Sequence, residues 1–367
     1  MSFSLERTTN DLQDEAMAVA EGAAKAAFGT RFKRVPRALF AKLSLPVISV
    51  IAVVAFVFGA TMDVLRKWAA AADSIQRETT LLSFWSLTLH EYVLSFTTTL
   101  AMVMYLCCVY RDPGRVPAGY APDPESLLAN GALVELKRKG GSRFCKKCVK
   151  HKPPRAHHCR QCNRCVLRMD HHCVWVNNCV GHRNYKSFFL FLFYVVVSIW
   201  HATSLLASHA YLAGFANEPT WRDDSEVYRK QHRGASAASA IPVGVAEVAA
   251  LTLAVPLTLA LTLLFAWHCY LVSRNKTTIE HYEGVRASSS SSAGGNVPPL
   301  HATEGEARHP YSLGLRANLR EILGPRVLCW LAPGCSIAGD GLAFANVAEY
   351  GKWKRARARR EEELTLS

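Results

Sequence analysis

The stretch CKKCVKHKPPRAHHCRQCNRCVLRMDHHCVWVNNC, residues 145–179, contains seven cysteines and five histidines within 35 residues. Cysteine and histidine at such short spacings are typical of structural zinc sites, each of which takes four ligands in a tetrahedron. Two sites of three cysteines and one histidine would use six cysteines and two histidines. The stretch therefore predicts two zinc sites, with one thiol and several imidazoles left over for chemistry.

Four other segments are long and apolar enough to cross a membrane as helices. The last three contain a single charged residue, Glu247, at the edge of the fourth segment. A buried core helix is the alternative for any one segment, but soluble cores rarely supply four such lengths. We therefore predict an all-α polytopic membrane protein with four transmembrane helices, over residues 43–62, 92–110, 187–213 and 245–272.

The distribution of lysine and arginine predicts the orientation of these helices. Cytosolic loops carry an excess of both residues, and the loop 111–186 holds 16 of them against four in the loop 215–238. The cysteine-rich stretch and both termini are thus expected in the cytosol. No cleavable signal peptide is expected, because the first apolar run starts too late and is too long. Reducing conditions disfavour disulfides, which again favours zinc.

This topology divides the chain into five parts. A cytosolic tail precedes the first helix, and the zinc-binding and catalytic region, 145–188, lies between the second and third helices. The parts are the tail 1–42, helices one and two with a luminal loop 43–110, the cytosolic loop 111–186, helices three and four with a luminal loop 187–272, and the cytosolic C-terminal region 273–367.

The spacing of the cysteine-rich stretch resembles that of the DHHC protein S-acyltransferases, or palmitoyltransferases, which are named after an Asp-His-His-Cys tetrad. Here the tetrad occupies residues 170–173, and the run Cys-x2-Cys-x9-His-Cys-x2-Cys-x2-Cys-x4-Asp-His-His-Cys-x5-Cys begins at Cys145. An Asp-Pro-Gly motif at 112–114 and a Thr-Thr-Ile-Glu motif at 277–280 also match the family. The resemblance extends from residue 43 to about residue 325.

The resemblance implies a particular division of the zinc ligands and leaves Cys173 free. With four protein ligands, each zinc would be structural and would keep no open position for water or substrate. One zinc ion would be held by Cys145, Cys148, His158 and Cys165, and the other by Cys159, Cys162, His172 and Cys179.

The tetrad residues then have distinct expected roles. An imidazole next to a thiol can take its proton and give the reactive thiolate, so we expect His171 to act as the base for Cys173. Asp170 would hydrogen-bond to the other nitrogen of the ring and fix its orientation. The resemblance implies that Thr278 supports Asp170 through a further hydrogen bond. Glu280, in the same motif as Thr278, receives no role from the sequence.

The expected reaction is acyl transfer at the cytosolic membrane surface. Cys173 would take a long-chain acyl group, such as palmitoyl, from acyl-CoA and pass it to cysteines of substrate proteins near the membrane. The resemblance favours the Golgi or endoplasmic reticulum. Ser198 is expected either to line the far end of an apolar tunnel for the acyl chain or to serve in helix packing.

Cationic residues near the membrane are candidates for the coenzyme A phosphates. The alternative is that they only satisfy the topological bias or bind anionic lipids. These residues are Arg183, Lys186, Arg274 and Lys276.

Three other functions compete with acyl transfer. An inactive zinc-containing membrane scaffold would share every metal ligand but would not need the intact tetrad. A nucleic-acid-binding module is disfavoured because the cysteine cluster lies between membrane spans. A thiol oxidoreductase would need a free Cys-x2-Cys pair, which zinc is expected to occupy. Two departures from the family pattern are noted: Val174 replaces a common proline, and His309 replaces the asparagine that usually opens a C-terminal motif.

Overall fold

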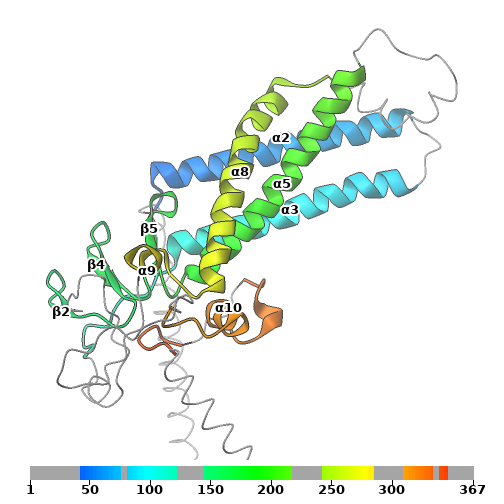
Figure 1. The fold of residues 1–367 in the computed structure, drawn as a ribbon. Coiled ribbons are helices and arrows are strands. Elements are labelled where there is room, and N and C mark those ends of the chain that lie inside the picture. The colour runs from blue at the N-terminus through cyan, green and yellow to red at the C-terminus, as the bar shows by residue number, and fades with distance from the viewer. Residues whose placement is uncertain are drawn as a thin grey trace, which may run out of the picture.

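The computed structural model describes residues 42–75, 81–121, 144–216, 242–284, 309–333 and 339–345. Most of the N-terminal tail, the Ser/Gly-rich insertion at 287–296 and most of the predicted second luminal loop lie outside these residues. Four long helices form an elongated bundle, and three small β-hairpins and the C-terminal elements gather at one end of it (Figure 1). The helices are α2 Leu45–Ile75, α3 Leu81–Tyr110, α5 Tyr185–Ala216 and α8 Val245–Ser273.

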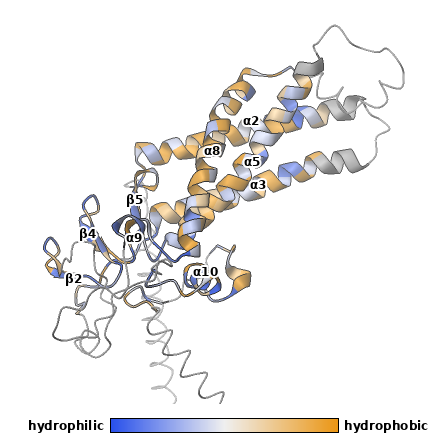
Figure 2. Ribbon diagram, viewed as in Figure 1, coloured by the Kyte–Doolittle hydropathy of each residue, from blue (hydrophilic) through white to orange (hydrophobic). Residues whose placement is uncertain are grey.

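All four helices are long and apolar enough to cross a membrane, which confirms the predicted fold class of a multi-pass membrane protein. Apolar residues dominate the bundle, whereas the hairpin end is mixed (Figure 2). The first helix continues past residue 62 to Ile75 and the second begins before residue 92. Hydropathy marks only the part of a helix that lipid surrounds. Beyond the apolar run, α2 continues through charged residues, among them Asp63 and Lys67, which form an i,i+4 pair.

Within the bundle, α5 packs along both α3 and α8. The side chain of Ser198 in α5 is buried, and its hydroxyl lies 2.6 Å from the hydroxyl of Thr98 in α3. This hydrogen bond joins two helices in an apolar environment. Ser198 therefore has the helix-packing role that was one of its two expected roles.

Three two-stranded antiparallel hairpins follow α3 and precede α5. Each strand is only two or three residues long, and hairpins of this size have little stability alone. Ligands that cross-link the hairpins must therefore supply much of their order. The pairs are β1 Phe144–Cys145 with β2 Lys150–His151, β3 His157–Cys159 with β4 Arg164–Val166, and β5 His171–Cys173 with β6 Asn178–Val180.

The third hairpin is fixed directly to the membrane helices. The buried amide of Asn178 donates to three carbonyl oxygens at the C-terminal end of α3, those of Cys108, Val109 and Arg111. These carbonyls have no partner within the helix. From inside α3, the Tyr105 hydroxyl donates to the carbonyl of Trp175, at 2.8 Å. The strand pair that carries the tetrad is therefore positioned by a membrane span.

A buried arginine, Arg155, joins the hairpins to the elements that follow α8. Its Nε and Nη2 donate to the two carboxylate oxygens of Glu280 at 2.7 and 2.9 Å, in the short helix α9 Thr278–Glu283. Its guanidinium also lies 4.5 Å from the ring centre of Tyr311 and 4.9 Å from that of Phe344. This gives Glu280 a role that sequence reasoning did not find.

The C-terminal motif docks on the same ion pair. The Nε2 atom of His309 lies 3.4 Å from Glu280, so the histidine that replaces the usual asparagine is still buried at the docking contact. Helix α10 Leu315–Leu323 follows. Its Asn318 donates to the last-turn carbonyl of Ser273 in α8 at 2.8 Å. The C-terminal region is thus held by α8 and by Glu280.

The substitution Glu280→Gln should destabilise the folded protein strongly. It removes the nearer of the two carboxylates that face the buried charge of Arg155, and breaking a buried ion pair typically costs about 3–5 kcal/mol. Thermal unfolding in detergent would measure the loss. Asp63→Asn, which breaks the exposed pair with Lys67, should cost about 1 kcal/mol or less. Equal unfolding midpoints for the two variants would contradict this assignment.

Candidate active site and metal centres

The eight predicted zinc ligands gather into two sets. Within each set the ligand atoms all lie within 4.8 Å of one another. The division is the one that the resemblance implied, with Cys145, Cys148, His158 and Cys165 in one set and Cys159, Cys162, His172 and Cys179 in the other.

The distances within each set fit a tetrahedral zinc ion. Nδ1 of His158 and Nδ1 of His172 each lie 3.2 to 3.9 Å from the three sulfurs of their own set. Zinc bonds of about 2.3 Å to sulfur and 2.0–2.1 Å to nitrogen, at tetrahedral angles, place these atoms about 3.6 Å apart. Two Cys3His clusters therefore fit two structural zinc ions.

Strand geometry explains why the two sets interleave. His158 lies directly opposite Cys165 across the second hairpin, and His172 lies directly opposite Cys179 across the third. Opposite residues project to the same face, so each pair presents a nitrogen and a sulfur to one metal. Neighbouring residues project to opposite faces. His158 and Cys159 are neighbours, and they accordingly belong to different sets.

The same alternation separates the reactive groups from the metal. In strand β5, His171 and Cys173 project to one face while His172 projects to the other, toward its zinc set. The imidazole of His171 and the backbone N–H groups of Trp175 and Val176, in the 3-10 turn η1 Val174–Val176, lie close to the sulfur of Cys173. Burial raises the pKa of the Cys173 thiol, but these groups favour the thiolate more strongly and lower the pKa below the ordinary value.

Asp170 completes this arrangement from a fully buried position. Nδ1 of His171 donates to Asp170 at 2.7 Å. Burial alone would lower the pKa of His171, but the hydrogen bonds to Asp170 and Cys173 raise it to about 9. Thr278 donates to Asp170 from its backbone N–H and from its hydroxyl, both at 2.8 Å. The groups can hold a thiolate beside a protonated imidazole.

The ring of His171 is also packed by two membrane helices. Its centre lies 5.3 Å from that of Phe188 in α5 and 6.2 Å from that of His268 in α8. The hydroxyl of Tyr185 lies 3.1 Å from Nδ1 of His268. The sequence had not singled out His268. A histidine inside a predicted membrane span was the available signal, because such residues are usually functional.

The four cationic candidates do not share one environment. Arg183 and Arg274 are exposed, and Lys276 is half-buried. Lys186 is buried, and its ammonium donates to the carbonyls of Leu323 and Cys329, both at 2.8 Å. The structure thus gives Lys186 a packing role in place of the phosphate contact expected from the sequence.

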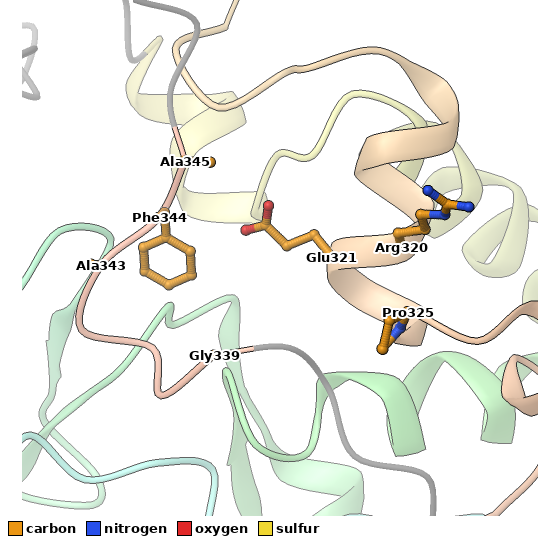
Figure 3. Close-up of a pocket in the computed structure, with 7 residues that line it drawn as sticks. All are labelled: Arg320, Glu321, Pro325, Gly339, Ala343, Phe344 and Ala345. Carbon is orange, nitrogen blue, oxygen red and sulfur yellow. The ribbon is translucent and has the colours of Figure 1, made fainter. Parts of the chain in front are cut away.

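A cavity of about 460 Å³ lies apart from these groups, between α10 and residues 339–345 (Figure 3). Glu321 and Phe344 line it, and both also lie close to Arg155. No zinc ligand and no tetrad residue lines this cavity. The cavity therefore lies at the interface between α10 and residues 339–345, and it is not part of the candidate active site.

Comparison with known proteins agrees with this geometry. Residues 138–285 match the family model described as DHHC palmitoyltransferase. The chain is 40% identical to the probable protein S-acyltransferase 16 of Arabidopsis thaliana over 303 residues, which cover 82% of the chain and 92% of that protein. It is 37% identical to the probable protein S-acyltransferase 15 of the same plant, over 70% of the chain and 88% of the relative. With human palmitoyltransferase ZDHHC15 the identity is 34%, over 64% of the chain and 61% of the relative. The chain belongs to the DHHC palmitoyltransferase family.

Proposed function

We propose that this protein transfers a long-chain acyl group from acyl-CoA to cysteine thiols of other proteins, through a thioester on Cys173. The observation that carries the proposal is the free thiol of Cys173, which lies beside His171, has a lowered pKa and belongs to neither metal set. His171 is in turn paired with the buried carboxylate of Asp170. This is the arrangement of a nucleophile, its base and an orienting carboxylate.

The two steps follow from these groups. The Cys173 thiolate attacks the acyl carbonyl carbon, the bond from that carbon to the coenzyme A sulfur breaks, and the leaving thiolate takes the proton held by His171. In the second step His171 accepts the proton of a substrate thiol, whose sulfur attacks the acyl-enzyme and releases Cys173. One thioester replaces another in each step, so neither step needs an oxidant or an external energy source.

The surroundings of Cys173 support a lipid donor. Its side chain packs against an apolar cluster at the ends of the membrane helices, which includes Tyr105, Phe188 and Leu192. The acyl chain would lie among the helices, where each buried methylene contributes about 0.8 kcal/mol. Arg183, Arg274 and Lys276 remain the candidates for the coenzyme A phosphates.

The proposed location is the cytosolic face of an endomembrane, the Golgi or the endoplasmic reticulum. The excess of lysine and arginine in the loop 111–186 supports the cytosolic side. The protein substrates would carry cysteines close to the membrane surface, where Cys173 lies. The zinc ions would hold the hairpins in place and would take no part in bond changes, because each has four protein ligands.

Self-acylation of purified protein tests the proposal. With a clickable palmitoyl-CoA analogue, wild type should gain a label that hydroxylamine removes, as expected for a thioester. Cys173→Ser should gain none, and His171→Ala should label about 10²–10⁴ times more slowly because it lacks the base. Cys269→Ser, which changes a half-buried thiol outside both zinc sets, should label like wild type. An unlabelled wild type that is folded and binds two zinc ions would favour the scaffold alternative.

Thr278→Val should slow self-acylation by about ten- to hundredfold without abolishing it. The variant loses the hydroxyl that donates to Asp170 but keeps the backbone N–H that donates to the same carboxylate, and one lost hydrogen bond to a charged group is worth about 1.5–3 kcal/mol. The initial rate of labelling measures the effect. Thr252→Val is a matched control, because that exposed hydroxyl bonds only to Val248 in its own helix. Equal labelling rates for the two variants would show that the Thr278 hydroxyl does not support Asp170 in the reaction.

Loss of a zinc ligand should impair labelling even though Cys173 is retained. Cys148→Ala and Cys162→Ala each remove one ligand, one from each set. Both variants should bind less zinc per chain and label more slowly, since the hairpins depend on the metal for their order. Metal analysis and the labelling rate, measured on the same samples, make the comparison. Full labelling of a zinc-depleted variant would show that the zinc ions are dispensable for the active site.

A further inference from the structure

The segment that follows α10 exposes large apolar side chains. It contains the 3-10 turn η2 Val327–Cys329. Leu328 is 98% exposed, Val327 53% and Leu331 52%. Three such side chains within five residues expose apolar area that would be unfavourable in water. In Figure 2 the ribbon of this turn is in the hydrophobic colour, beside the mostly hydrophilic α10. We call residues 327–331 the apolar loop.

The apolar loop lies along a membrane-spanning helix. Near the start of α5, the ammonium of Lys186 donates to the carbonyl of Cys329. Further along the same helix, the hydroxyl of Tyr194 donates to the carbonyl of Leu331 at 2.7 Å. Tyr194 is nine residues beyond the start of α5, which corresponds to about 13.5 Å of helix at 1.5 Å per residue. The loop therefore runs beside a part of α5 that belongs to the candidate membrane span Tyr185–Ala213.

The inner side of the apolar loop is fixed to the protein. Trp330 packs against the apolar cluster that contains Phe189 and Ile322, and its indole N–H donates to the carbonyl of Gly324 at 2.9 Å. The Lys186 ammonium donates to the carbonyl of Cys329 in the loop and to that of Leu323 at the end of α10. With its inner side anchored in this way, the loop presents its apolar side chains outward in a defined direction.

Cationic side chains border the apolar loop. Arg316 and Arg320 are exposed on α10, and the exposed Arg326 directly precedes η2. Arginines next to an apolar surface are typical of segments that enter the boundary between lipid headgroups and acyl chains. The loop also contacts α5 within its candidate membrane span. Both features favour lipid over a protein partner.

We propose that the apolar loop inserts into the bilayer leaflet nearest the zinc hairpins, beside α5, without crossing the membrane. Its apolar side chains contact lipid acyl chains, and the three bordering arginines lie at the level of the headgroups. Helix α10 is attached to Arg155 through Glu321, at 3.7 Å. Insertion of the loop therefore fixes the depth of the C-terminal region relative to the membrane. The buried ion pair between Arg155 and Glu280 is fixed at the same time, because α10 is attached to it. This inference does not depend on acyl transfer.

Photo-crosslinking to lipid tests the insertion. Leu328→p-benzoylphenylalanine and, separately, Leu331→p-benzoylphenylalanine are reconstituted in nanodiscs of phosphatidylcholine and phosphatidylserine and irradiated, and lipid adducts are counted by mass spectrometry. The control is Val149→p-benzoylphenylalanine, which replaces a side chain that is 76% exposed on the first zinc hairpin. Zinc content shows that each variant is folded.

Positions 328 and 331 should yield at least tenfold more lipid adduct than position 149. Lipid adducts at the level of position 149 would overturn the proposal. Crosslinks from position 328 to protein in place of lipid would also overturn it, because they would show that another part of this chain or a second copy covers the loop. The second reporter, at position 331, keeps the test valid if one substitution disturbs the local packing.

Discussion

The buried ion pair between Arg155 and Glu280 determines where helix α9 lies, and the active site depends on that position. Taking both charges out of water is costly, and it is offset only where every donor of the guanidinium finds an acceptor. Four of the five N–H groups of Arg155 donate to Glu280 and to the side chain and backbone of Asn275, and Glu321 lies 3.7 Å from Nη1. Thr278 lies two residues before Glu280, so the same contact delivers its hydroxyl and N–H to Asp170. A series of direct contacts thus runs from the ion pair through Asp170 to the base and the thiol.

The third hairpin solves a second problem, which is to hold a reactive thiol close to a metal without letting the metal bind it. Zinc binds thiolates strongly, and Cys173 is adjacent to the zinc ligand His172. The alternation of side chains along a strand separates the two, because it directs His172 toward Cys179 and sends Cys173 to the opposite face with His171. The backbone N–H groups of η1 also help to lower the pKa of the Cys173 thiol. Ligation and reactivity can therefore reside in neighbouring residues.

The features that the sequence predicted correctly depend on the spacing of residues that are close together in the chain. Four apolar runs, two ligand sets and the contact from Thr278 to Asp170 followed from periodicity, from Cys-x2-Cys pairs and from the family motifs. The features that were missed depend on contacts between distant residues. Arg155 and Glu280 are 125 positions apart, and no pattern near either residue indicates that they meet. Lys186 was read as a phosphate ligand because it is basic and next to a membrane span, but the C-terminal segment buries it. The first helix ends 13 residues after its predicted end and the second begins 11 residues before its predicted start, because hydropathy reports the lipid boundary and not the end of the helix.

The candidate active site is assembled from parts that no single segment contains. The hairpin supplies Cys173 and His171, and α9 supplies the donors to the neighbouring Asp170. The rings that pack against His171 come from α5 and α8, which are membrane spans. A base whose orientation depends on these rings and on this carboxylate is correctly placed only when the helices, the hairpins and α9 are assembled together. The cysteine-rich stretch determines the chemistry, but the membrane helices supply part of the geometry in which that chemistry can occur.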